Sequence, residues 1–317
     1  MSSSPVICVG GENLIDHVTR DGEVSALAGG SPFNVAMALG RQAAEVHYLT
    51  PISTDSWGDT LADTLVTSGV ALSGGRVDAP TTIARVTVTD GIPSYQFERD
   101  GTAERSVTTA SLAAAMPSNT AALHTGSLAL TDGVDANAWE QTCKTAYEAG
   151  TLVSLDPNVR LSVITDIDAY RGRILRMMQT THVLKLSDED LEGLCPDLPQ
   201  SEALDLVREK TSAALVVMTK GPDGASAWCG DRQIDIPAPP VPGLVDTVGA
   251  GDTFMATLLS GLARIEALSP AELLTLDAAQ VEALIRRAGM AAAINCSRAG
   301  CNPPTLQELD AAMSSAD

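Results

Sequence analysis

Residues 246–254 have the sequence DTVGAGDTF, in which two closely spaced glycines stand shortly before an apolar segment. The apolar residues recur at helical spacing: Phe254, Met255, Leu258, Leu259 and Leu262. Gly249 and Gly251 permit backbone conformations in which successive N–H groups converge on one anion, and the positive end of the following helix faces the same anion. The stretch therefore predicts an anion-binding turn that leads into a buried helix.

Asp252 lies in the first turn of the predicted helix, where the positive end of the helix stabilises its charge. In this place its carboxylate is suited to accept a proton from a hydroxyl group that attacks a bound phosphate. The alternative is a tight turn followed by an ordinary acidic first-turn residue. A pattern as short as GxGD does not decide between the two.

The stretch as a whole resembles the second signature of the ribokinase-like carbohydrate kinases, the PfkB family. In that family the aspartate of GAGD is the catalytic base, and the backbone amides before it form an anion hole. The resemblance implies that Asp252 is the base and that Gly249, Ala250 and Gly251 form the anion hole. It also implies ATP as the phosphoryl donor, with Mg²⁺ neutralising the phosphates. The sequence contains no GxxxxGK[ST] loop, so the P-loop kinase mechanism is excluded.

The chain has 317 residues, of which 44% are hydrophobic, so it can bury a large core, most simply as one kinase domain over residues 1–317. Its 40 acidic and 20 basic residues give a net charge of −20, which disfavours binding to nucleic acid or to an anionic membrane. The six cysteines are scattered without a CxxC pair, which indicates free thiols. No secretory signal or long apolar stretch is evident, so we expect a cytoplasmic protein.

The first strand is predicted at residues 6–9, an apolar run that ends at a pair of glycines. In open α/β sheets, ligands gather at the carboxyl ends of the strands. Asp16 follows this strand, and by composition alone it is an ordinary solvated acid. The family resemblance implies instead that Asp16 binds sugar hydroxyls, because the family places such an aspartate just past the first strand.

Residues 28–40 have the sequence AGGSPFNVAMALG, a glycine turn that leads into a helix. Asn34 in the first turn offers both a donor and an acceptor to a polyol, and a simple packing turn is the alternative. The stretch resembles the family's first signature, in which the glycine pair, here Gly29 and Gly30, and the asparagine contact the sugar. Ser31 stands where ribokinases often carry lysine, and in this respect the chain resembles fructokinases.

Apolar and polar residues alternate within residues 81–105, which predicts a hairpin with one apolar face. Such a hairpin has to cover either the active site or another subunit. In the resembled family, strands of this kind form a lid over the sugar and often a dimer contact. We therefore expect a homodimer with lid strands near residues 12–28 and 81–107. Phe97 and the residues that follow it resemble fructokinase lids.

Predicted strands and helices alternate regularly from residue 121 onward. The strands are expected near Leu123 and over residues 152–155, 183–186 and 215–218. This succession predicts an α/β fold with a doubly wound, mostly parallel sheet flanked by helices. Together with a small β-sheet lid, it is the ribokinase-like architecture that the resemblance implies.

Polar residues near the ends of these strands are candidates for the site. Arg160 ends the sequence DPNVR, residues 156–160, which resembles the DPN-x-R of fructokinases and implies contact with sugar or phosphate; a surface cation is the alternative. Lys185, Ser187 and Asp190 fall in the stretch that aligns with the family's Asn-x-x-Glu region. The resemblance assigns Lys185 and Ser187 to the nucleotide and Asp190 to Mg²⁺ through water, although Ser187 and Asp190 replace the family's Asn and Glu.

Two further segments resemble nucleotide-binding parts of the family. Thr219, Gly221 and Gly224 lie in a strand-to-turn segment similar to the family's nucleotide-phosphate loop. A bare hairpin turn is the alternative, because such turns are common. Asn295 begins a loop at the position where family members place groups near adenine.

A monovalent cation is the remaining expectation. The resemblance implies K⁺ beside the anion hole, with Asp246 and Val248 as candidate ligands. Pro304 has no hydroxyl at a place where ribokinase supplies one, which leaves activation by K⁺ open.

The residues and the resemblance together predict an ATP-dependent sugar kinase. A pocket with few cations fits a neutral polyol better than a phosphorylated or carboxylated sugar, so we expect the conversion of D-fructose to fructose 6-phosphate. Alternatives are 2-keto-3-deoxygluconate, with Arg160 holding its carboxylate, and ribose. A catalytically silent sugar- or nucleotide-binding regulator is the alternative from another class, and the intact Asp252 disfavours it.

Overall fold

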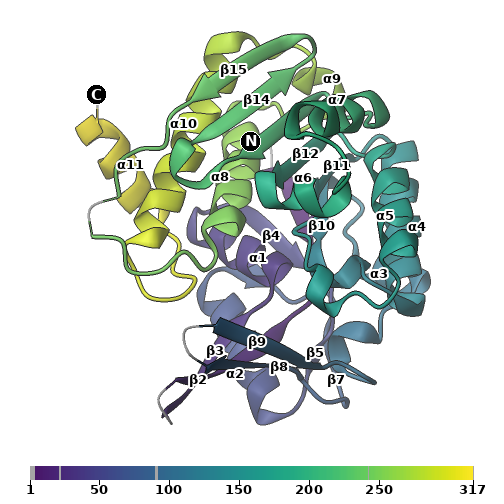
Figure 1. Cartoon of the computed structure of the whole chain (residues 1–317). Helices are drawn as coiled ribbons and strands as arrows, with labels where there is room; N and C mark the ends of the chain where they lie inside the picture. Colours follow the sequence, from purple (N-terminus) through teal and green to yellow (C-terminus); the bar gives the residue numbers. More distant parts are fainter. Residues whose placement is uncertain (1–3, 21–22, 90–91, 242, 317) are drawn as a thin grey trace.

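A large sheet forms the centre of the computed structural model, which describes residues 4–20, 23–89, 92–241 and 243–316 (Figure 1). In this part of the chain the sheet has nine strands. Their spatial order is β15 (Arg232–Ile236), β14 (Ala225–Cys229), β13 (Leu215–Thr219), β12 (Val183–Ser187), β11 (Leu152–Asp156), β10 (Thr120–Gly126), β1 (Val6–Val9), β4 (Glu45–Tyr48) and β6 (Val70–Ala71).

The strands from β6 to β13 run parallel, whereas β14 and β15 are antiparallel. The predicted doubly wound, mostly parallel sheet is therefore confirmed. After residue 218 the sequence predicts only a strand-to-turn segment, or a bare hairpin turn, and the structure adds the antiparallel strands β14 and β15 at this edge of the sheet. Short runs joined by a tight turn pair locally, so they extend the sheet without a helical crossover.

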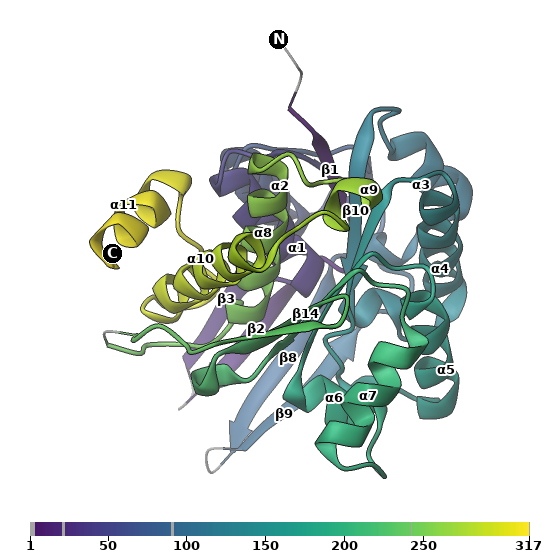
Figure 2. The same ribbon diagram turned by 90° about the horizontal axis from the view of Figure 1, so that it is seen from above.

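Helices cover both faces of the sheet (Figure 2). One face carries α1 (Ser31–Arg41), α2 (Ser56–Thr67), α8 (Ala250–Arg264) and α10 (Ala278–Cys296), and the other carries α3 (Thr109–Ala115), α4 (Gly133–Glu148), α5 (Ile167–Met178), α6 (Asp188–Leu194) and α7 (Gln200–Lys210). Strand β1 shows how the layers are joined. Ile7 and Val9 enter the first core cluster while Val6 and Cys8 enter the second, because successive side chains of a strand point to opposite faces.

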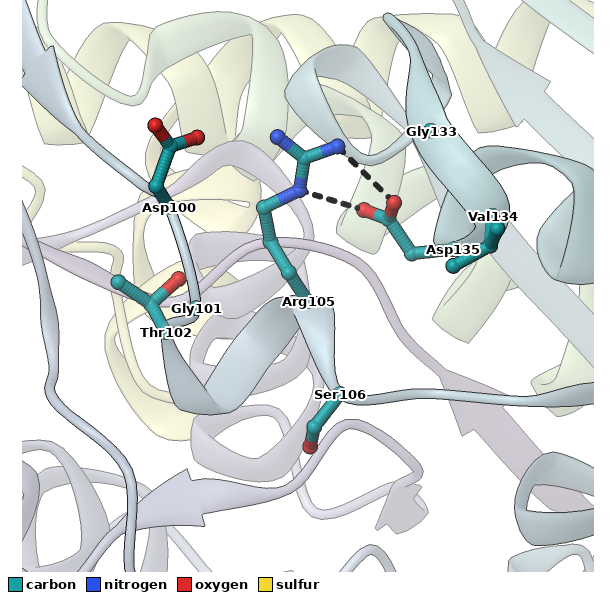
Figure 3. A pocket seen from close by; sticks show the side chains of 8 residues that line it. All are labelled: Asp100, Gly101, Thr102, Arg105, Ser106, Gly133, Val134 and Asp135. Carbon is teal, nitrogen blue, oxygen red and sulfur yellow. Dashed lines mark hydrogen bonds and ion pairs between the residues drawn. The ribbon is translucent and has the colours of Figure 1, made fainter.

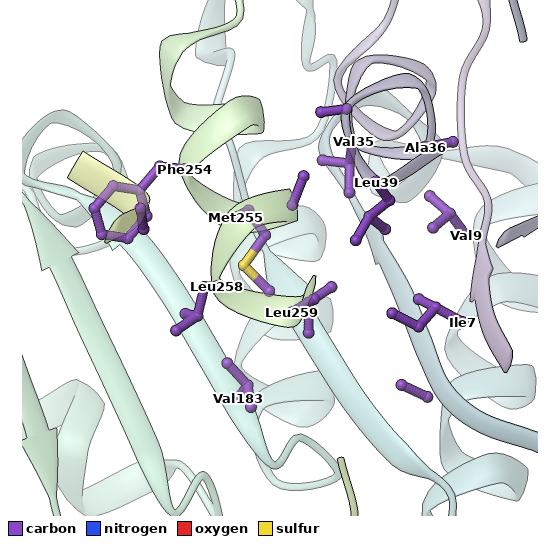
Figure 4. Close-up of a cluster of buried hydrophobic side chains, with 14 of the residues drawn as sticks. Ile7, Val9, Val35, Ala36, Leu39, Val183, Phe254, Met255, Leu258 and Leu259 are labelled. Carbon is purple, nitrogen blue, oxygen red and sulfur yellow. The ribbon is translucent and has the colours of Figure 1, made fainter. Parts of the chain in front are cut away.

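Helix α8 is the helix predicted after the glycine turn, and it is buried on nearly all sides. Figure 4 shows Met255 and Leu259 facing α1, where Val35 and Leu39 meet them in the same core cluster. Because α8 packs between α1 and α10, its amino end is held rigidly against the amino-terminal third of the chain.

A separate small sheet lies below the main one in Figure 1. Its order is β3 (Glu23–Gly29), β2 (Leu14–Arg20), β8 (Thr82–Thr89) and β9 (Ile92–Glu98). The predicted hairpin is the antiparallel pair β8–β9, and β8 also pairs in parallel with β2. Residues 21–22 and 90–91, within the two predicted lid ranges, lie outside the described residues.

The remaining elements are short or peripheral. They are the strand pair β5 (Ile52–Ser53) and β7 (Arg76–Val77), the helices α9 (Pro270–Leu273) and α11 (Leu306–Ala316), and the 3₁₀ turns η1 (Ala103–Arg105), η2 (Ser127–Leu130), η3 (Leu161–Val163) and η4 (Gly221–Asp223). All six cysteines are free thiols, as predicted. None of the helices in the described ranges combines the length and the apolar character that crossing a membrane requires.

Candidate active site

Asp252 lies in the first turn of α8 and is only 7% exposed. The hydroxyl of Ser31 donates to its Oδ1 over 2.7 Å, and the side-chain amide of Asn34 donates to its Oδ2 over 2.8 Å. Both donors belong to the first turn of α1. The packing of α1 against α8 therefore brings the two predicted signatures together around one carboxylate.

The environment of Asp252 has opposing effects on its affinity for a proton. Burial raises the pKa of the carboxyl, while hydrogen bonds from Asn34 and Ser31 and the charges of Lys185 and Arg160 oppose the rise, leaving the pKa above its ordinary value. A buried carboxylate with a raised pKa is a better proton acceptor than a solvated one. This is the property that the predicted catalytic base requires.

The glycine turn before α8 has a conformation that suits glycine. Gly249 has φ 74°, and a Cβ added there would meet the sulfur of Cys301 at 2.3 Å. A Cβ on Gly251 would lie 3.0 Å from Nζ of Lys185. Because the first N–H groups of a helix have no acceptor within it, the turn can present amides at the amino end of α8, beside the ammonium of Lys185.

Lys185 is paired with Asp156, a residue for which no role was predicted. Its Nζ lies 2.8 Å from Oδ2 of Asp156, and both side chains are buried. Burial raises the pKa of Asp156 to about 6, against the opposing effect of the Lys185 ammonium. The other oxygen, Oδ1, has no hydrogen-bond partner. A lysine inside the apolar run of β12 was the signal available in the sequence, because a buried ammonium requires a partner.

Glu12 is a second residue that the sequence analysis does not assign. It is 1% exposed, its Oε1 accepts the N–H of Ser31 over 3.0 Å, and its Oε2 accepts the N–H of Ala129 over 3.2 Å. Burial raises the pKa of Glu12 to about 7. An acidic residue directly after the glycine pair that follows β1 was the signal available in the sequence.

The predicted sugar ligands surround the start of α1. Asp16 is half-buried on β2, and burial raises its pKa to about 6. A Cβ on Gly29 would lie 2.7 Å from Oδ2 of Asp16, so a side chain there would displace the Asp16 carboxylate. Gly30 has φ 109° and precedes α1. The buried Oδ1 of Asn34 has no partner.

Phe97 lies on β9, and Arg160 directly precedes η3. Phe97 lies opposite Ala84 in the small sheet and packs, half-buried, against the cluster of Leu14, Ala84 and Leu128. Arg160 is exposed, and its guanidinium donates to the carbonyl oxygen of Val159 over 2.9 Å. Their contacts with substrate remain predictions.

Ser187 and Asp190 form the amino-terminal cap of α6. Oδ2 of Asp190 accepts the N–H of Ser187 over 2.7 Å, and Oδ1 accepts the N–H of Val159 over 2.6 Å. Both oxygens are thus engaged by backbone amides, which fits contact with Mg²⁺ through water better than direct ligation. No cluster of three or more His, Cys, Asp or Glu side chains suited to a metal occurs among the described residues.

The predicted nucleotide-phosphate loop follows β13. Thr219 ends that strand, and the next residues form η4 before the chain returns as β14. Gly221 has φ 52° with no atom within 4 Å of an added Cβ, so space is open beside it. Gly224 has φ 89°, and a Cβ there would lie 2.0 Å from the carbonyl oxygen of Ile236. The backbone of the loop is therefore closely packed at Gly224 and has free space beside it at Gly221.

Asn295 and Asp246 bind the backbone of the loops around the glycine turn. Asn295 donates to the carbonyl oxygen of Val248 over 2.7 Å and accepts the N–H of Asn302 over 2.8 Å. Asp246 accepts the N–H groups of Val248 and Gly300. The structure thus brings these residues together next to the anion-binding turn, and their roles toward nucleotide and K⁺ remain predictions.

A surface hollow of about 350 Å³ lies elsewhere, between the segment after β9 and the start of α4 (Figure 3). It is lined by Asp100, Gly101, Thr102, Arg105, Ser106, Gly133, Val134 and Asp135. Arg105 is paired with both Asp132 and Asp135. The charge of Arg105 is thus neutralised, and none of the predicted site residues lines the hollow. The hollow is therefore not part of the candidate site.

Comparison with known proteins shows the family of the chain. The model of the pfkB family carbohydrate kinases matches residues 9–308. The chain therefore belongs to the PfkB family and is a sugar kinase.

Several relatives of known name are fructokinases. The chain is 38% identical to the fructokinase of Rhizobium leguminosarum bv. trifolii over 280 residues, which cover 86% of this chain and 84% of that protein. It is 30% identical to a probable chloroplastic fructokinase-6 of Arabidopsis thaliana, over 82% and 71% of the two chains. The crystal structure of fructokinase with bound ATP from Xylella fastidiosa superposes with a TM-score of 0.90, at 25% identity over 98% of each chain.

Proposed function

We propose that this protein is an ATP-dependent fructokinase that transfers the γ-phosphoryl group of ATP to a primary hydroxyl of D-fructose and forms fructose 6-phosphate. The observation that supports it most is the buried carboxylate of Asp252 at the amino end of α8, held by Ser31 and Asn34. The names of the relatives point to the same sugar, and a neighbour of the same fold is described with ATP bound.

In this mechanism Asp252 accepts the proton of the attacking sugar hydroxyl. The amides of Gly249, Ala250 and Gly251 receive the charge that develops on the transferred phosphoryl group. The ammonium of Lys185, 3.0 Å from the Cβ position of Gly251, adds a positive charge beside them. Mg²⁺, contacted through water near Asp190, would neutralise phosphate charge when bound.

The proposed sugar follows from the polar groups near Asp252. Asp16, Asn34 and the amides of Gly29 and Gly30 offer acceptors and donors to adjacent hydroxyls of a neutral polyol. Among the predicted sugar-binding residues, the only cation is Arg160, and its positive charge acts on the Asp252 carboxyl. That same charge favours the second candidate, 2-keto-3-deoxygluconate, because its carboxylate needs a cation.

We also propose that the chain forms a single kinase domain in which the small sheet covers the sugar and joins two subunits in a homodimer. Strand β3 supports this proposal because it is an edge of the small sheet and exposes Ser25, Ala26 and Leu27. The nucleotide role of Thr219, Ser187 and Asn295, the K⁺ role of Asp246 and Val248, and a cytoplasmic location belong to the same proposal.

A coupled assay of ADP release tests the function. Fructose, ribose, 2-keto-3-deoxygluconate, tagatose phosphate and adenosine are compared by kcat/KM, and fructose is expected to give the highest value. A preference for the keto-deoxy acid that Arg160→Ala abolishes would replace fructose and keep the kinase. A folded protein that releases ADP with none of these compounds would favour a silent binding protein.

A further inference from the structure

Ser31 connects the candidate base to a second buried carboxylate. Its hydroxyl donates to Oδ1 of Asp252 over 2.7 Å, and its N–H donates to Oε1 of Glu12 over 3.0 Å. The other oxygen of Glu12 accepts the N–H of Ala129 over 3.2 Å. One continuous set of hydrogen bonds therefore links η2, the segment between β1 and β2, the start of α1 and the start of α8.

The hydroxyl of Ser31 does not serve its own helix. The residue that precedes α1 is Gly30, and α1 has no side-chain cap. Ser31 is instead 7% exposed and directs its hydroxyl to a residue 221 positions away. A serine at the start of a helix usually satisfies local backbone groups, so this arrangement calls for another role.

We propose that Ser31 is a positioning residue that fixes the orientation of the Asp252 carboxylate, and that Glu12 holds Ser31 in place for it. This inference rests on the proposed function. Asn34 binds one oxygen of Asp252 and Ser31 binds the other, so the two donors together fix rotation about the Cβ–Cγ bond. Each carboxylate oxygen keeps a lone pair with which to accept the proton of the sugar hydroxyl.

The Ser31 hydroxyl also affects the proton affinity of Asp252. A donor that bonds the ionised carboxylate lowers its pKa, so the loss of the Ser31 hydroxyl raises the pKa of Asp252. The charges that face Asp252 from other elements are the cations Lys185 and Arg160, the carboxyl of Asp156 and the thiol of Cys301. Replacing Ser31 alone leaves all four of these residues in the chain.

The test compares Ser31→Ala with Ser31→Thr, which keeps a hydroxyl, and with Ser56→Ala, which removes an exposed serine from the first position of α2. We expect Ser31→Ala to lower kcat about 10–100-fold, to leave the KM for ATP within about twofold, and to move the acid limb of kcat/KM upward by about one pH unit. Ser31→Thr should recover much of both effects, and Ser56→Ala should behave as wild type. If Ser31→Ala folds poorly, Ser31→Cys replaces it, because a thiol is similar in size to a hydroxyl but a weak hydrogen-bond donor. The same upward shift of the acid limb is expected for Ser31→Cys.

A second measurement does not depend on the identity of the sugar. A ¹³C NMR titration of the Asp252 carboxyl, assigned with Asp252→Asn, should show a higher pKa in Ser31→Ala than in wild type. An unchanged carboxyl titration, or lower turnover with an unmoved acid limb, overturns the positioning role. If the wild-type protein phosphorylates another sugar, only the assignment of fructose as substrate is overturned. The effect of Ser31→Ala is then measured with that sugar.

Discussion

The side-chain amide of Asn34 lies 2.8 Å from Oδ2 of Asp252, although the two residues are 218 positions apart. Asn34 belongs to the predicted sugar-binding turn and Asp252 to the predicted phosphoryl-transfer turn. This hydrogen bond directly joins the turn predicted to bind the sugar to the turn predicted to transfer the phosphoryl group. Since α1 and α8 pack side by side in the core, this proximity is a property of the rigid scaffold.

Replacing the candidate base tests the chemistry directly. Asp252→Asn keeps the size of the side chain but cannot accept the proton, so kcat should fall by about 10²–10⁴ while nucleotide binding persists. Steady-state ADP release and nucleotide titration measure the two effects. Asp59→Asn, an exposed aspartate in the first turn of α2, is the matched control. Near-normal turnover of a folded Asp252→Asn protein would remove Asp252 from its role.

The Lys185–Asp156 pair should show separate effects on stability and activity. Lys185→Met leaves a buried carboxylate without its cation, and a loss of about 3–5 kcal/mol in the free energy of unfolding is expected. Adding Asp156→Asn should restore part of that stability. It should not restore kcat, because the cation beside the Gly251 turn is still missing. Urea unfolding and single-turnover rates check this, and a double variant with wild-type kcat would contradict the role of Lys185.

The glycine turn is expected to be sensitive to one methyl group. Gly249→Ala adds left-handed strain and a collision with Cys301, so a cost of about 2–4 kcal/mol and a large loss of kcat are expected. Gly75→Ala is the control, because its φ of 71° is similar and no atom lies within 4 Å of its added Cβ. It should cost about 1–2 kcal/mol and leave kcat unchanged. Equal stability losses in the two variants would show that the contact with Cys301 is not limiting.

Glu12 should make stability depend on pH. Its pKa rises from 4.5 to about 7 on folding, so the folded state holds more protons than the unfolded state in that window. Stability contributed by the protonated form is therefore lost as pH rises from about 4.5 to about 7, by about 2–4 kcal/mol. Asp16 and Asp156, whose pKa values rise to about 6, also contribute to the loss of stability in part of the same range, so urea unfolding should show a smaller loss in Glu12→Gln than in wild type. Glu148→Gln, at an exposed glutamate of α4, should keep the full loss. Parallel curves for wild type and Glu12→Gln would refute the prediction.

The proposed dimer is tested at the edge strand of the small sheet. Ala26 is exposed and pairs with His17, so its side chain points to the face opposite that of Asp16. If this face joins two subunits, Ala26→Lys buries a charge and should shift the protein from dimer to monomer, whereas Ala26→Ser should not. Light scattering measures the mass, and a monomeric wild type would leave only the covering role of the sheet.

Much of the fold was determined by local features of the sequence. The glycine turn before an apolar helix predicted α8, because backbone freedom and helical spacing are properties of a few consecutive residues. The apolar runs separated by helical segments predicted the parallel sheet in the same way. The alternating residues after Thr81 predicted the β8–β9 hairpin.

The tertiary structure alone decided which of the candidate residues meet. Lys185 reaches Asp156 because β11 and β12 are neighbours in the sheet, and the order of strands is not encoded in the period of either strand. Ser31 reaches Asp252, and Glu12 reaches Ser31, because β1, α1 and α8 converge in space. A sequence pattern reports the conformation of neighbouring residues. The contacts of Asp252 with Ser31 and Asn34, over 221 and 218 positions, depend instead on how the whole core packs.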